Sequence, residues 1–268
     1  MKTILQTLAA ILLSSINSFS QKGMVKFQIG YGLPLTSTHS LAGSSTVVNG
    51  STTTFTGAYG SYGSGLRLEA GYIHPFNERL HLEMDITYLF GKPIESTYKG
   101  SGSTQSQSSS SRFYEFSPLL RVNLGGNKIK PYAAIGPVFG LGTITDTYKA
   151  SSTSGTNSGE AQVEYTGSVA IGAKSAVGAE FTQGKFVFYA QLTLIGMSYS
   201  PDKSEVTKYI FNGTDQLPSF TTADKQTVYR NSYTVANGGS DPNKPKEELK
   251  IFIPYSNVSL NVGVMFKL

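Results

Sequence analysis

The sequence contains neither cysteine nor tryptophan. Without cysteine there is no disulfide framework, no thiolate metal site, no cysteine nucleophile and no lipid-modified N-terminal cysteine. Charged residues make up only 15% of the chain, whereas about 25% is usual for a soluble domain. The formal net charge of +5 is small and spread along the chain, so we expect no nucleic-acid partner.

Long apolar runs are also missing. A membrane-spanning helix needs about 20 mostly apolar residues in succession, and no stretch of this sequence provides them. Membrane-spanning strands remain possible, because their apolar residues occur only at every second position.

Residues 1–20, MKTILQTLAAILLSSINSFS, have the pattern of a secretory signal peptide. Lys2 lies in a short positive region, an apolar core follows, and Ser18 and Ser20 are small residues before Gln21. An amphipathic or buried first helix is the alternative interpretation. The pattern predicts an exported protein in which residues 21–268 form one domain.

After residue 22 the sequence alternates between apolar and polar residues, which is the period of half-buried strands. Most of the alternating stretches reach the roughly 9–11 residues that a tilted strand needs to cross a bilayer. We predict eight strands, at residues 25–33, 66–72, 80–90, 114–124, 129–142, 169–181, 186–194 and 258–268. Pro118 and Pro137 predict a bulge or local break, because proline cannot donate a hydrogen bond to a sheet.

The connections between these strands alternate between two lengths. Short turns rich in Gly, Asn and Pro occur at residues 75–78, 125–128 and 182–184, and long connections occur at 35–62, 91–111, 145–163 and 200–249. In an up-and-down meander all the short turns meet at one end. The pattern therefore predicts an all-β fold, an eight-stranded antiparallel transmembrane β-barrel with short periplasmic turns and long extracellular loops.

Either face of such a barrel could be the apolar one, since soluble ligand carriers have apolar interiors. The polar face here combines charged residues with many glycines, and an eight-stranded interior has little room for long side chains. We therefore expect the polar face inside, with its charges paired in a structural network. The residues assigned to this lumen network are Arg67, Glu69, Glu83, Asp85, Glu115, Arg121, Lys174 and Glu180, which Lys26 could join.

Three segments carry a resemblance to a known class. They are Ser18-Phe19-Ser20-Gln21, the segment KPYAAIGP at 130–137, and the final strand VGVMFKL at 262–268. The chain resembles the small outer-membrane β-barrel proteins of Gram-negative bacteria, of the OmpX and OmpW kind, and more narrowly those common in the Bacteroidota. The resemblance implies a place in the outer membrane, contact with its lipids and lipopolysaccharide, and recognition of the last strand by the barrel assembly machinery.

Residues for catalysis are scarce. His39 is the one histidine near the predicted extracellular rim. A serine lies beside it, but in a serine-rich loop this neighbour is expected by chance and does not indicate a catalytic pair. Motifs for a nucleophile, a phosphate loop or a metal site are missing. We expect a protein that is not an enzyme and holds no cofactor or metal, with a structural or surface-interaction role through loops whose extracellular partner is unknown. The alternative is a narrow channel or an OmpW-like passage for small hydrophobic molecules.

The second long connection ends in a serine tract, SGSTQSQSSSS, at residues 101–111. It has no apolar residue with which to bury surface, so we expect a mobile loop there. Residues 206–211 and 227–235 of the last long connection could form a hairpin above the barrel.

Overall fold

The computed structural model describes residues 23–35, 39–100, 102–126, 128–152, 157–234 and 241–268. The predicted signal peptide, residues 1–20, lies outside these ranges. The described chain is almost entirely β-structure, with one four-residue helix, α2 (Thr222–Lys225), and one 3-10 turn, η1 (Leu217–Ser219). None of the described helices is long and apolar enough to cross a membrane.

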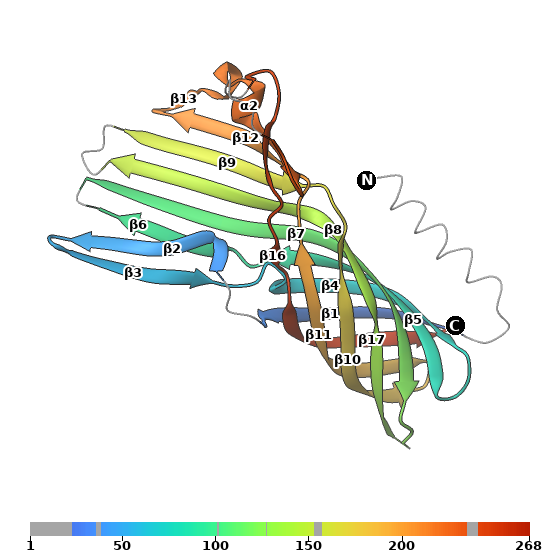
Figure 1. Cartoon of the computed structure of the whole chain (residues 1–268). Coiled ribbons are helices and arrows are strands. Elements are labelled where there is room, and N and C mark those ends of the chain that lie inside the picture. Colours follow the sequence, from blue (N-terminus) through green and yellow to red (C-terminus); the bar gives the residue numbers. More distant parts are fainter. Residues whose placement is uncertain (1–22, 36–38, 101, 127, 153–156, 235–240) are drawn as a thin grey trace.

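Within the described ranges, eight strands close into an antiparallel barrel, as the sequence predicts (Figure 1). Each strand pairs with the next, and β1 pairs with both β4 and β17, which closes the ring. The barrel strands are β1 (Met24–Pro34), β4 (Gly65–Pro75), β5 (Leu80–Gly91), β7 (Ser103–Asn123), β8 (Ile129–Ser152), β10 (Ala170–Gln183), β11 (Phe186–Tyr199) and β17 (Asn257–Lys267).

One end of the barrel holds the short connections. The segments between β4 and β5, β7 and β8, and β10 and β11 are only a few residues long, and Gly184 has φ 63° in the last of them. The start of β1 and the end of β17 lie side by side at this same end, where Met24 pairs with Lys267. The eight strands thus place both ends of the barrel domain beside its short turns.

The two prolines interrupt one ladder without changing its register. Pairing between β7 and β8 stops after Phe116–Phe139 and resumes at Leu120–Ile135. Pro118 lies on one side of this gap and Pro137 on the other, while their pairing with β5 and β10 continues. The predicted local break is confirmed, and it occurs without a bulge.

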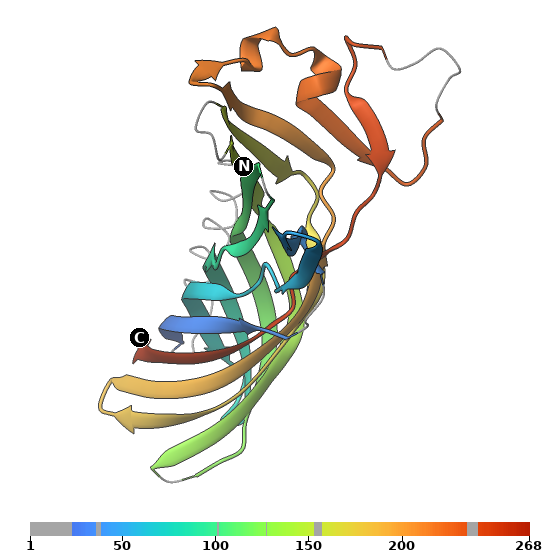
Figure 2. The ribbon, with the colours of Figure 1, turned by 90° about the vertical axis from the view of Figure 1, so that its left-hand side faces the viewer.

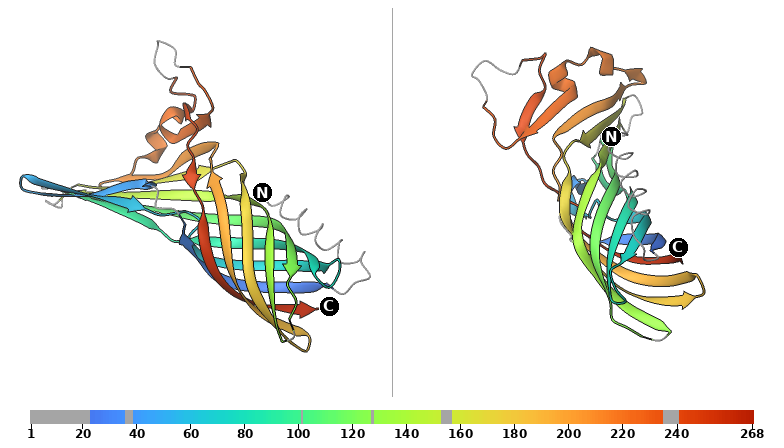
Figure 3. Two further views of the ribbon diagram at one scale, coloured as in Figure 1. Left: turned by 60° about the horizontal axis from the view of Figure 1, so that its bottom comes forward. Right: turned by 90° about the vertical axis from the view of Figure 1, so that its right-hand side faces the viewer.

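At the other end the structure continues as a sheet that projects well beyond the barrel (Figures 1 and 3). β7 and β8 run without interruption from the wall into this extension, with lengths of 21 and 24 residues. A smaller lobe with α2 lies at the far side of the extension (Figure 2). The added strands are β2 (His39–Asn49), β3 (Thr52–Tyr59), β6 (Ile94–Lys99), β9 (Ser158–Thr166), β12 (Lys203–Phe211), β13 (Thr214–Asp215), β14 (Gln226–Arg230), β15 (Lys246–Leu249) and β16 (Ile253–Pro254).

The expectation of a loop in the serine tract was wrong. Residues 103–111 form the first part of β7, where all of them pair with β8 and residues 104–109 also pair with β6 on the other side. Backbone hydrogen bonds from two neighbours hold this strand, so it needs little apolar burial of its own. Alternate serines also face inward, where Ser109 donates to Asp146 and the Ser111 hydroxyl donates to the Tyr62 carbonyl at 2.6 Å.

Candidate functional site: the filled lumen

The outer wall of the barrel is apolar around its whole circumference. Leu260 on β17 is 66% exposed, and Leu120 on β7 and Leu192 on β11 are also exposed. Every barrel strand contributes side chains of this kind, because each alternates one outward apolar residue with one inward residue. The exposed members include Phe27, Ile29, Leu66, Leu68, Phe90, Ile135, Phe139, Ile171, Val177, Phe188, Leu194 and Val262.

All eight residues assigned to the lumen network face the interior and are buried. Glu83 and Arg121, for example, are each 1% exposed. The strand alternation dictates this orientation, since nearly all of these charged residues lie between two outward apolar ones. The set comes from four strands: Arg67 and Glu69 on β4, Glu83 and Asp85 on β5, Glu115 and Arg121 on β7, and Lys174 and Glu180 on β10.

Two lysines and three carboxylates form the centre of the network. Lys26 Nζ lies 2.8 Å from Glu69 Oε1 and 3.0 Å from Asp85 Oδ1, and it also pairs with Glu83. Lys174 Nζ lies 2.7 Å from Glu69 Oε2 and 2.9 Å from Asp85 Oδ2. Each lysine thus bridges the strands on which these carboxylates stand, which ties β1, β4, β5 and β10 together across the lumen.

Two arginines complete the set. Arg121 pairs with Glu180 and lies 3.5 Å from Glu83 Oε2, and its guanidinium lies 3.6 Å from the centre of the Tyr132 ring. Arg67 forms a separate pair with Glu115. Four buried cations therefore meet five buried carboxylates, so the interior charge is nearly balanced, as burial of ions requires.

Glycines on the inner face provide the room for these groups. A Cβ placed on Gly71 would lie 2.4 Å from Asp85 Oδ1, and one on Gly30 would lie 1.8 Å from Asn261 Oδ1. Any larger residue at these two positions would displace the neighbouring inward side chain.

Glu69, Glu83 and Asp85 are also the one described group whose carboxylates could hold a metal, since their oxygens lie within 4.8 Å of one another. The ammonium groups of Lys26 and Lys174 already lie among these oxygens at hydrogen-bonding distance. Because two ammonium groups occupy the space between the three carboxylates, and Arg121 also lies beside Glu83, the geometry is that of an ion-pair network rather than a metal centre.

Two solved structures resemble this fold. The outer membrane protein OprG from Pseudomonas aeruginosa is 11% identical with a TM-score of 0.45, and the alignment covers 92% of this chain and 95% of that one. The attachment invasion locus protein Ail of Yersinia pestis is 10% identical with a TM-score of 0.30, covering 92% of this chain and 100% of that one. No family model and no curated protein matches the sequence.

Sequence reasoning missed an apolar layer that packs inside the barrel above the charges. Phe113 on β7 packs edge-on against Tyr199 at 4.9 Å and contacts Tyr255 at 4.6 Å, measured between ring centres. Tyr62 and Tyr255 come from the segments that enter the barrel mouth, where Tyr62 N donates to the Pro254 carbonyl at 3.0 Å. The buried layer consists of Tyr62, Leu89, Ile94, Phe113, Val138, Ile144, Ala170, Ile195, Met197, Tyr199, Ile253 and Tyr255.

A sequence signal for this layer does exist. Near the long-connection end of β5 the alternation gives way to three apolar residues in succession, Tyr88, Leu89 and Phe90. A continuous apolar run in a strand indicates burial on both faces. The positions of Tyr62 and Tyr255 have no comparable signal, because they depend on how two distant connections fold over the barrel mouth.

The histidines lie where the strand predictions place them. His74 and His81 are buried beside the turn between β4 and β5, and His81 Nε2 lies 3.1 Å from Asn123 Nδ2. His39 begins β2, and its side chain lies outside what the structure describes.

Proposed function

We propose that this protein is an integral barrel of the Gram-negative outer membrane. The observation that carries the proposal is the inversion of polarity: apolar side chains cover the outer wall, and paired ions fill the interior. A water-soluble monomer rarely exposes a contiguous apolar patch above about 300–600 Å². Here the apolar belt surrounds all eight strands, so a bilayer is its natural solvent.

The orientation follows from the two ends of the barrel. The short turns and both ends of the barrel domain face the periplasm, and the projecting sheet faces the cell exterior. In this proposal residues 1–20 are an export signal that is cleaved off, and residues 21–268 form the mature barrel domain. The outer wall contacts membrane lipids and lipopolysaccharide, the final strand is read by the barrel assembly machinery, and the chain belongs with the Bacteroidota-type barrels.

The role proposed for the barrel is a sealed, non-enzymatic scaffold that displays the projecting sheet. Two layers close the lumen: the ion-pair network centred on Lys26 and Lys174, and the apolar layer around Phe113. Moving an ion through the second layer would require it to lose most of its hydration among mainly apolar side chains, which offer only a few tyrosine hydroxyls in return. The filled interior favours a surface-interaction or envelope-integrity role over a narrow channel or a passage for hydrophobic molecules.

The test combines location and conduction. Membrane fractionation and heat-modified migration on a gel should recover a folded protein in the outer membrane. Planar bilayers containing that protein should remain silent, because both lumen layers block the path. Recovery in the soluble periplasm refutes the membrane assignment, and stable single-channel currents from the unmodified protein refute the sealed lumen.

A further inference from the structure

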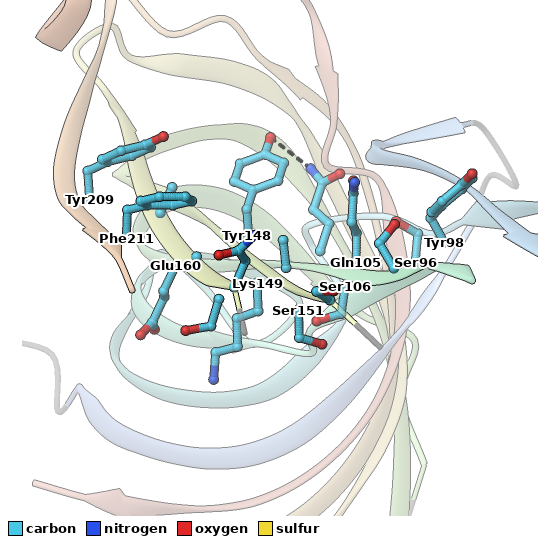
Figure 4. A pocket seen from close by; sticks show the side chains of 18 of the residues that line it. Ser96, Tyr98, Gln105, Ser106, Tyr148, Lys149, Ser151, Glu160, Tyr209 and Phe211 are labelled. Atoms are coloured by element: carbon cyan, nitrogen blue, oxygen red, sulfur yellow. Dashed lines mark hydrogen bonds between the residues drawn. The ribbon is translucent and has the colours of Figure 1, made fainter. Parts of the chain in front are cut away.

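A groove lies on the projecting sheet (Figure 4). Most of its lining residues on β7 and β8 continue the alternation of the inward positions of these strands from the barrel wall. Five neighbouring strands, β6, β7, β8, β9 and β12, form its floor and sides. Its volume is about 570 Å³, within the usual range of about 300–1,000 Å³ for a small-ligand site.

The strand register places the lining residues in two rows that cross all five strands. Residues paired directly across strands share a face of the sheet, so each row points into the groove. The first row is Ser96, Gln107, Tyr148, Ala161 and Tyr209. The second row is Tyr98, Gln105, Ala150, Gly159 and Phe211.

These rows give the groove aromatic side walls and a floor that includes small residues. Tyr209 and Phe211 stand at one edge and Tyr98 at the other, while the small residues Gly159 and Ala161 lie between strands that carry rings. Phe211 is 47% exposed and Tyr98 is 39% exposed, so both rings offer a free surface. The side chains of Gln105 and Tyr148 place amide and hydroxyl groups between the edges.

Neither of the two rows contains a charged residue. Two charged residues, Lys149 and Glu160, also line the cavity, but they are cross-strand neighbours whose side chains extend to the other side of the sheet from Tyr148 and Gln105 (Figure 4). Glu160 forms an ion pair with Lys208, with Nζ and Oε2 2.8 Å apart. A phosphate, a carboxylate or a cation would therefore find no opposite charge among the ten residues of the two rows.

Two of the rings are held in place before any ligand arrives. Tyr148 donates its hydroxyl to Asp146 Oδ2 at 3.2 Å and accepts from Gln107 Nε2 at 2.9 Å. The Tyr209 ring packs against Phe220 at 4.7 Å between ring centres. Preorganised side chains lose less conformational freedom on binding, which raises affinity.

We propose that this groove binds a neutral oligosaccharide from the medium around the cell. A pyranose ring has an apolar C–H face that stacks on tyrosine or phenylalanine and an edge of hydroxyl groups that bonds to amides and hydroxyls. The two rows of the groove supply both kinds of partner and contain no charged residue. The sheet ladders use the backbone groups of the floor strands, so a peptide would gain no main-chain pairing there.

The face of the sheet that carries the groove indicates that the sugar comes from solution rather than from the surrounding lipids. The groove faces the barrel axis, whereas the surrounding lipids and their headgroup sugars lie against the outer wall. The proposal rests on the membrane orientation above, because that orientation exposes the projecting sheet to the cell exterior.

The test is calorimetric titration of the folded full-length mature protein in nanodiscs with cellopentaose, maltopentaose, laminaripentaose and chitopentaose. At least one of these should bind with saturable, millimolar or tighter affinity. Phe211→Ala should weaken that binding about threefold to tenfold, because it removes one stacking ring. Gln105→Ala should weaken it as well, through the lost amide contacts.

Matched controls lie on the opposite face of the same strands. Ile210→Ala on β12 and Thr104→Ala on β7 should leave the dissociation constant unchanged, since each lies next to a groove-facing residue of its strand and so belongs to the other face. Failure of all four sugars to bind overturns the proposal, as does binding that survives Phe211→Ala and Gln105→Ala. Stronger binding of a sulfated oligosaccharide also overturns it. Heat-modified migration of the same samples tests the membrane barrel separately, so a folded barrel that binds no sugar refutes only the groove.

Discussion

Arginine placed at the middle of the outer wall should destabilise the barrel in a bilayer. On β17 the outward apolar residues run from Val258 to Phe266, so Val262 lies at their centre, and it pairs with Ile29 at the centre of β1. Val262 is 54% exposed on the outer wall. Val262→Arg should therefore cost about 2–4 kcal/mol of folding free energy, the cost of a guanidinium near the bilayer midplane.

Two control variants separate this effect from lost packing and from simple addition of charge. Val262→Ala removes the same side chain without adding charge, and it should cost about 1 kcal/mol or less, since half of the valine surface contacts only lipid. Leu124→Arg places the charge just beyond the short-turn end of β7, where Leu124 is 68% exposed. Near the interface the cost should fall to about 0–1 kcal/mol.

The assay is urea-dependent folding into lipid vesicles. The folded fraction at each urea concentration is measured as the fraction of protein whose gel migration changes on heating. Equal costs for Val262→Arg and Leu124→Arg would refute a depth-dependent lipid contact. A Val262→Arg variant as stable as Val262→Ala would refute the assignment of this wall to the membrane.

Three further predictions concern the interior and the projecting sheet. Arg67→Met and Glu115→Leu should each cost about 3–5 kcal/mol in the same vesicle assay, because each leaves a buried charge unpaired, whereas the double variant should cost less than either; additive costs would contradict this. Burial raises the pKa of Asp146, so the sheet should be more stable below that raised pKa and lose stability as the pH rises through it. Limited proteolysis of the sheet should show this pH dependence and should lose it in Asp146→Asn. Gly136→Ala should cost about 1–3 kcal/mol by vesicle folding, because the new Cβ would lie 2.1 Å from a backbone carbonyl of β7, while Gly196→Ala, with open space, should be neutral.

The barrel wall was predictable because its signal is local. Each transmembrane stretch carries its own alternation, and that alternation survives without knowledge of any partner strand. The same logic placed Glu83 and Arg121 in the interior before their partners were known. It could not reveal which carboxylate each cation meets, since Lys26 contacts residues more than forty positions away in the sequence.

The projecting sheet was not predictable in the same way. The serine tract of β7 has no hydrophobic pattern, and it becomes a strand only because β6 and β8 lie on both sides of it. The groove depends on the register of five strands, in which Tyr98 and Phe211 stand in one row although they are far apart in the chain. Register is a property of the assembled sheet, because a shift of one residue would turn each side chain to the other face.

By itself, the sequence determined the number of barrel strands, the end at which the short turns gather, and the face of each strand that carries charge, because all three follow from a two-residue period and local turn chemistry. The tertiary structure decided the ion pairs, the apolar layer beneath the projecting sheet and the groove above it. These features arise where residues distant in the chain meet, and such meetings depend on strand register and on the packing of connections over the barrel mouth.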